Sequence, residues 1–257
     1  MPSQLANSAS PPPAPLSSGQ LTAPDTWRTQ SVIGFEKLFD AWPPPGLQQA
    51  QPLAQADLAA LRLALDEGGQ IGVRAVVLLA RSGDERVPQV LLARLEERVP
   101  APGRADDAVD VVAAAAIAAW PSALQVPHAA DEPAPPSTAT RLAQLAFGPG
   151  AHPDLEVRVE CARTALLGGQ SEVIPFLLRV LRAETPTQHL SPPDWERVET
   201  LTWAKTRAAQ ALALHLGVKQ TLRPDGSFAH IEEAVQGYER LLGLSSPGRA
   251  LASDNSR

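Results

Sequence analysis

The residue types that most often carry catalysis or bind metals are few in this chain and lie far apart. The single cysteine, Cys161, falls in an apolar run, where a small buried hydrophobe is the expected role and a nucleophile is the alternative. The five histidines share no catalytic or metal-ligand spacing, and they are His128, His152, His189, His215 and His230. We expect His128, His152 and His189 to be solvated and His215 to end a helix. We therefore predict no catalytic residue, no metal site and no cofactor.

Two further patterns resemble functional motifs but have simpler explanations. Asp106, Asp107 and Asp110 could attract a cation, yet acidic residues in the first turn of a helix are favourable without a metal. The Gly-Gly pairs at 68–69 and 168–169 follow helical runs, so we interpret them as helix C-caps rather than nucleotide-binding loops. Neither pattern predicts an active site.

Composition and charge exclude several classes of protein. The chain has 22 Lys and Arg against 28 Asp and Glu, and this acidic balance lacks the basic field that a nucleic-acid partner requires. No apolar stretch approaches the roughly 18 residues of a membrane span, and we expect no signal peptide. A lone cysteine allows no internal disulfide, so we predict a cytoplasmic protein that binds neither nucleic acid nor a membrane.

The first 48 residues precede the main helical region and divide into two segments. Residues 1–25 are rich in Ser, Pro and Ala and carry too few large apolar groups to form a core, so we predict a disordered leader. In 26–48, four apolar residues recur at spacings of three, four and three on one helical stripe, and they are Val32, Phe35, Phe39 and Trp42. We expect this stripe to cap the array that follows; a helix offered to a partner is the alternative.

From residue 53 to 244 the apolar spacing predicts helix after helix. Gly83-Asp84 joins two of them, and Pro88 and Pro175 each stand in a helix's first turn, where a missing N–H costs nothing. Two polar, proline-rich insertions, at 121–136 and 185–193, interrupt the series and should be surface loops. We predict a polar tail at 245–257.

One phrase recurs along the helical region. It reads GVRAVVLLARSGDERVPQVLLARLEE from Gly72, EVRVECARTALLGGQSEVIPFLLRVLRAE from Glu156, and in part KTRAAQALALHLG from Lys205. This pattern resembles HEAT repeats, particularly the short bacterial type first associated with phycobilisome lyases. The resemblance implies an all-α, right-handed α-solenoid of about four HEAT-like helix pairs, an armadillo-like fold.

An arginine recurs near the start of the first helix of each copy. Arg74, Arg158 and Arg207 could be ligands for an anion. The structural interpretation, which we favour, is that each guanidinium bonds carbonyls or carboxylates of the adjoining repeat while its stem covers apolar surface.

The second helices of HEAT-like arrays usually line the concave surface, so we looked for binding residues on two such segments. In SEVIPFLLRVLRAE the apolar stripe should face the core, and Phe176, Arg179 and Arg182 should then point outward. An aromatic residue with two arginines is typical of a protein-binding hot spot, and solvated charge is the alternative. The corresponding earlier helix offers Gln89 and Arg94. A further pair, Trp195 and Trp203, is eight residues apart and near one helix face, where a core role is more common than a ligand cage.

These patterns predict a non-enzymatic protein-binding scaffold or accessory subunit whose partner is another protein. One alternative, suggested by the lyase-associated repeat type, is a lyase-like factor that handles a bilin or another prosthetic group. A second alternative is a HEAT-like DNA-base glycosylase using Asp194 with Trp195 and Trp203, which the acidic balance disfavours.

Overall fold

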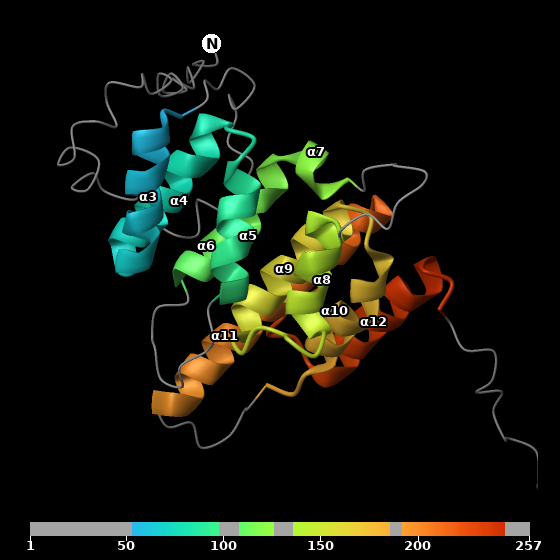
Figure 1. The fold of residues 1–257 in the computed structure, drawn as a ribbon. Helices are drawn as coiled ribbons and strands as arrows, with labels where there is room; N and C mark the ends of the chain where they lie inside the picture. The colour runs from blue at the N-terminus through green and yellow to red at the C-terminus, as the bar shows by residue number, and fades with distance from the viewer. Residues whose placement is uncertain (1–52, 98–107, 126–135, 186–191, 245–257) are drawn as a thin grey trace, which may run out of the picture. The chain divides into compact units, whose positions relative to one another are not determined.

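The computed structural model describes residues 53–97, 108–125, 136–185 and 192–244, and every regular element in these ranges is helical (Figure 1). Contacts divide the chain into two compact units between Ala123 and Leu124. The first unit holds α3 (Gln55–Glu67), α4 (Gly69–Ser82), α5 (Val87–Glu97), α6 (Ala108–Ala116), the 3-10 turn η2 (Ile117–Ala119) and most of α7 (Pro121–Leu124). The second holds α8 (Thr138–Phe147), α9 (Leu155–Leu167), the 3-10 turn η3 (Ser171–Val173), α10 (Ile174–Arg182), α11 (Pro192–Leu216) and α12 (Phe228–Leu241).

Local sequence signals account for many of the helix ends. Ser137 caps α8 by accepting a hydrogen bond from the backbone N–H of Thr140 at 3.1 Å, and Asp154 caps α9 through Val157 at 2.9 Å. Gly217 ends α11 with φ of +65°, a conformation that residues with a side chain rarely adopt. These ends follow from the sequence because capping chemistry is local.

In the first unit, α4 lies at the centre and packs against α3, α5 and α6. The approach of α4 to α6 is close because Gly72 has no side chain: a Cβ there would lie 2.7 Å from Val109 Cγ2. Val109, Val112 and Ala113 of α6 are almost fully buried, so α6 is a core helix.

The turn between α4 and α5 is tied to the start of α3 by Asp84. Its buried carboxylate accepts hydrogen bonds from the backbone N–H of Leu53 at 2.8 Å and from the Arg86 side chain at 2.6 and 2.9 Å. Arg86 in turn donates to the carbonyl of Leu53 at 2.7 Å. The hydrogen bonds from Arg86 are the main cause that lowers the pKa of Asp84 from 3.8 to about 2.

In the second unit, α9 packs against α8, α10 and α11, and α10 packs against α11 and α12. Small side chains allow these close approaches: Ala162, Ala165, Ala204 and Ala208 are all fully buried. Within each unit, the main contacts of a helix are with helices one or two places away along the chain.

The predicted all-α class is confirmed for the described residues. One local prediction is wrong: residues 121–124 of the first insertion form the helix α7, and Leu124 is buried rather than in a surface loop. Leu124 lies beside Gly168, the residue that ends α9: a Cβ at Gly168 would be 3.1 Å from Leu124 Cβ. The helices α6 and α8, on either side of this insertion, fall in different compact units. The predicted segments 1–25, 26–48 and 245–257 lie outside the described residues.

None of the helices in the described ranges combines the length and the apolar character that crossing a bilayer would require.

Candidate functional site

The predicted hot spot on α10 does not form, because Phe176 points into the protein. The side chain is only 5% exposed, and the Arg158 guanidinium lies 4.9 Å from the centre of its ring. The prediction was wrong since α10 has neighbours on several sides, α9, α11 and α12, and buries a wider face than the assumed stripe. Arg179 is exposed as predicted from the same helix.

Arg182, the third residue of that hot spot, is bound within the chain. Its guanidinium makes paired hydrogen bonds with both carboxylates of α12 that face it, Glu232 at 3.0 and 3.0 Å and Glu239 at 2.7 and 3.0 Å. These bonds raise the pKa of Arg182 and lower that of Glu232. Arg182 therefore connects α10 to α12, and its donors are directed at these glutamates.

On α5, the other helix predicted to bind a partner, the arginine is also bound within the chain. Arg94 is mostly buried and bonds the fully buried carboxylate of Asp110 at 2.9 Å and the exposed Asp66 at 3.3 Å. The prediction that Arg94 faces a partner is thus wrong, because α6 supplies an internal carboxylate that sequence spacing does not reveal. Gln89 is exposed.

The recurring arginines make contacts inside the fold. Arg158 donates to the carbonyl of Ala146 on α8 at 2.7 Å, and burial together with the nearby Arg179 lowers its pKa. Arg207 on α11 bonds Glu160 on α9 at 2.5 Å and lies 5.9 Å from the Trp203 ring centre. Arg74 bonds Gln70 on its own helix at 3.3 Å.

Two prolines, the cysteine and one histidine that the sequence analysis discussed lie in the described part of the chain. Pro88 is buried in the first turn of α5, and Pro175 is exposed at the start of α10. Cys161 is fully buried, as expected. His152 was expected in solvent but is buried, because its Nδ1 accepts the backbone N–H of Asp154 in the loop before α9.

Tryptophan and lysine side chains of α11 lie in different environments. Trp195 is 54% exposed, whereas Trp203 is partly covered. Lys205 is buried, its ammonium donates to Thr185 Oγ1 at 2.8 Å, and burial lowers its pKa. Within the described ranges, no group of three or more His, Cys, Asp or Glu side chains is arranged to hold a metal ion.

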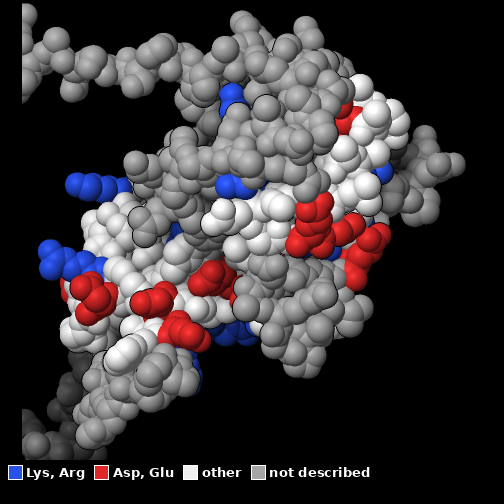
Figure 2. Space-filling view, turned by 90° about the vertical axis from the view of Figure 1, so that its left-hand side faces the viewer, with Lys and Arg blue, Asp and Glu red and all other residues white. Residues whose placement is uncertain are grey.

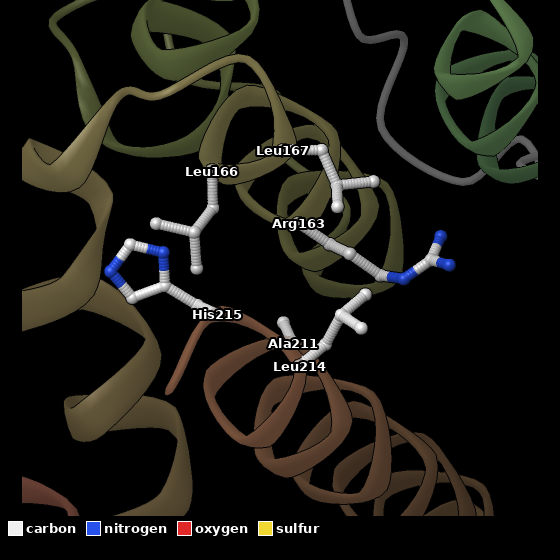
Figure 3. A pocket seen from close by; sticks show the side chains of 6 residues that line it. All are labelled: Arg163, Leu166, Leu167, Ala211, Leu214 and His215. Atoms are coloured by element: carbon white, nitrogen blue, oxygen red, sulfur yellow. The ribbon is translucent and has the colours of Figure 1, made fainter. Parts of the chain in front are cut away.

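A pocket that the sequence analysis missed lies between the C-terminal turns of α9 and α11 (Figure 3). Its volume is about 160 Å³, and it is lined by Arg163, Leu166, Leu167, Ala211, Leu214 and His215. Leu166 and Ala211 are each 4% exposed and form the floor, while Leu167 and Leu214 are 46% and 60% exposed and form the rim. Figure 3 shows the Arg163 guanidinium and the His215 ring at opposite ends, with the leucines between them.

The charge of this pocket depends on a carboxylate beneath it. Glu160 is fully buried and bonds Arg163 Nη1 through one oxygen at 3.1 Å and Arg207 Nε through the other at 2.5 Å. Burial lowers the pKa of Arg163, the carboxylate of Glu160 opposes this effect, and Arg207 adds to it. Two guanidinium groups, on α9 and α11, thus share this buried carboxylate.

One sequence signal could have pointed to the pocket. Leu214 falls outside the stripe of buried residues Ala204, Ala208, Ala211 and Leu212 on α11. An apolar residue outside the core stripe is common on protein surfaces by itself. Leu167 lines the same pocket as Leu214 only because α9 packs beside α11.

Charged side chains of both signs are mixed on the described part of the face drawn in Figure 2, with the larger groups acidic. That part of the face presents no broad basic area of the kind that phosphate backbones require.

Comparison with known proteins adds no relative: no protein-family model, no curated protein and no solved structure matches this chain significantly.

Proposed function

We propose that this chain is a non-enzymatic protein-binding scaffold or accessory subunit, built as a right-handed solenoid of about four HEAT-like helix pairs. The contacts within each unit support this architecture, because stacked hairpins place each helix beside helices one and two positions away along the chain. The internal bonds of Arg158 and Arg207 to preceding helices also fit it.

The observation that carries the binding function is the pair of exposed leucines at the α9–α11 pocket. Leu167 and Leu214 expose about half of their side chains to water beside an apolar concavity. Concave apolar surface with a few polar groups at its edge is typical of a recognition site. A cytoplasmic location remains part of the proposal and rests on the single, buried cysteine.

The pocket gives no support to the bilin-handling alternative. Pockets for drug-sized ligands occupy roughly 300–1,000 Å³. At about 160 Å³ this pocket is too small for a tetrapyrrole.

Affinity purification of the full chain from its native cells tests the proposal. We expect a protein to co-purify in a fixed stoichiometric ratio and to rebind the purified chain in size-exclusion chromatography. The substitution Leu214→Asp should weaken that complex by roughly tenfold or more, because one hot-spot side chain is worth about 1–2 kcal/mol.

Leu63→Asp is the matched control, since Leu63 on α3 is 68% exposed and belongs to the first unit, whereas the pocket belongs to the second. It should leave the complex unchanged. The proposal fails if no stoichiometric protein partner is recovered, and the assignment to the pocket fails if both substitutions have the same effect.

A further inference from the structure

We infer that Arg158 on α9 and Arg179 on α10 form a binding site for a phosphoryl group on a segment of the partner protein. This site rests on the proposed protein-binding function and adds a second contact for the partner, made by residues that do not line the α9–α11 pocket. It is supported by the position of the two side chains, by their charge and by the fixed setting of Arg158.

The ring of Phe176 brings the two arginines together. The Arg158 guanidinium lies 4.9 Å from the centre of this ring. Arg179 stands three residues after Phe176 on α10, and residues three apart are neighbours on the surface of a helix. Arg179 is also close enough to lower the pKa of Arg158, although burial is the larger cause. Two positive charges from different helices therefore lie near each other.

Both guanidinium groups lack a negative neighbour within the described part of the chain. No carboxylate there forms an ion pair with Arg158 or Arg179, and the charge that shifts the pKa of Arg158 is that of another cation. Other arginines differ, because each of them is bound to a carboxylate: Arg86, Arg94, Arg163, Arg182 and Arg207. An anion from outside would balance charge that the described residues leave unbalanced.

The acidic side chains on the neighbouring turns are engaged elsewhere or exposed. The Asp154 carboxylate caps the N-terminus of α9. Glu160 is shared by two other arginines, and the glutamates of α12 that face α10 are bound to Arg182. Glu172, just before α10, is exposed to solvent. An incoming anion thus meets two guanidinium groups and at most one solvated carboxylate, so attraction prevails.

Arg158 is already held in place for a ligand. Its Nε donates to the carbonyl of Ala146 at 2.7 Å, and its guanidinium packs on the buried ring of Phe176. Its two Nη groups donate to no acceptor among the described residues. A side chain that is ordered before binding loses less rotamer entropy, and a partly buried guanidinium binds an anion more strongly than one in water.

The charge of the pair favours a phosphoryl group over a single carboxylate. A phosphate monoester carries about −1.5 to −2 elementary charges at neutral pH and has three acceptor oxygens. It can neutralise both guanidinium groups, whereas one carboxylate leaves one of them uncompensated. The C-terminal end of α8, which Arg158 contacts at Ala146, opposes an anion with about half an elementary charge, against two full positive charges.

The open surface around the pair favours a phosphate attached to a protein. Pro175 and Arg179 are both exposed and lie four residues apart, on one side of α10. A free phosphate would keep much of its hydration there. A segment crossing α10 would add contacts on either side of its phosphoryl group, so we expect the ligand to be a phosphorylated segment.

NMR titration of the full chain, observed at the arginine Nε–Hε signals, tests the site. The probe is the peptide Gly-Ala-Ser-Ala-Gly with blocked ends and a phosphorylated serine, compared at constant ionic strength with its unphosphorylated form and with its glutamate version. We expect saturable shifts of the Arg158 and Arg179 signals with the phosphopeptide. The glutamate version should bind roughly tenfold more weakly, and the unphosphorylated peptide should give no saturable shift.

Substitutions in the protein test the same contacts from the other side. Arg158→Gln and Arg179→Gln should each weaken phosphopeptide binding by roughly tenfold or more. Arg62→Gln is the matched control, because Arg62 is an exposed arginine on α3 in the first unit, and it should change nothing. Arg179 is exposed, so Arg179→Gln keeps the test valid even if Arg158→Gln fails to fold.

Equal binding of the phosphorylated and unphosphorylated peptides would overturn the site, as would an equal effect of Arg62→Gln and Arg179→Gln. Inorganic phosphate is the free-ligand arm: if it binds as tightly as the phosphopeptide, the ligand is a small anion and not a partner segment. A stoichiometric cellular complex that survives both phosphatase treatment and Arg179→Gln would leave the scaffold function standing and remove only this site.

Discussion

Four arginine side chains in the described part of the chain connect one helix to another. Arg94 joins α5 to α6, Arg158 joins α9 to α8, Arg182 joins α10 to α12 and Arg207 joins α11 to α9. A planar guanidinium can satisfy several acceptors in fixed directions while its stem packs against apolar surface. Residue type alone therefore gives a poor indication of which arginines are available to a partner.

Asp84 should make stability depend on pH. Its pKa in the folded protein is about 2, below the ordinary 3.8, so its contribution is complete above pH 4 and is lost as the pH falls toward 2. We expect Asp84→Asn to reduce the free energy of unfolding by about 1–3 kcal/mol at pH 7, because the buried N–H of Leu53 and the Arg86 side chain lose a charged acceptor.

Urea unfolding of both proteins between pH 7 and pH 2.5 checks this expectation. The difference between wild type and Asp84→Asn should shrink as the pH falls below 4. Asp225→Asn is the control at an exposed aspartate in the turn before α12 and should show a small difference at every pH. A gap between wild type and Asp84→Asn that stays constant with pH would contradict the role given to this carboxylate.

The sequence predicted residue roles well where they depend on near neighbours. The positions of Pro88 and Pro175 in the first turns of their helices follow from backbone chemistry within a few residues. The orientations of Phe176 and Arg94 depend on helices distant in the sequence, and apolar spacing on one helix cannot show how many neighbours that helix has.

At the scale of helices, two glycines in helix interiors should respond oppositely to the same substitution. Gly72→Ala would place a Cβ 2.7 Å from Val109 Cγ2, and this overpacking costs about 1–3 kcal/mol, which exceeds the gain of about 1 kcal/mol in helix propensity. Gly237→Ala on α12 meets no atom within 4 Å and should stabilise by about 0.5–1 kcal/mol. Denaturant midpoints of the two variants give the comparison.

The double variant Gly72→Ala with Val109→Ala separates packing from backbone effects. It should recover part of the loss caused by Gly72→Ala, since the contacted methyl groups are removed. If Gly72→Ala alone stabilises the protein as Gly237→Ala does, α4 and α6 do not approach as closely as described.

The helices themselves were largely predictable from the sequence, whereas the pocket was not. Periodicity and capping residues indicate α9 and α11 separately, including the long run from Pro192 to Leu216. The pocket needs the C-terminal turns of both helices side by side, and it needs the small residue Ala211 on α11 beside Leu166 on α9. The pocket therefore depends on how two helices pack together, which the apolar spacing along each helix does not show.

For the whole molecule, each compact unit has its own buried core, and we expect the two to be destabilised separately. Gly72→Ala should increase amide hydrogen exchange in α4 and α6, while Arg182→Ala should increase it in α10 and α12. Hydrogen-exchange mass spectrometry of the full chain measures both. An equal response of both units to either substitution would show that they unfold as one cooperative body.

The ion pairs between Arg182 and α12 affect how α12 is oriented about its own axis. Glu232 and Glu239 are seven residues apart, about two helical turns, so they lie on the same side of α12. Ile231, Val235 and Tyr238 of α12 are buried, and the Tyr238 hydroxyl donates to the carbonyl of Ala209 at 3.5 Å. A shift of α12 by a single residue would turn both carboxylates away from the guanidinium. The two ion pairs of Arg182 therefore favour one rotational setting of α12 over settings that would separate these charges.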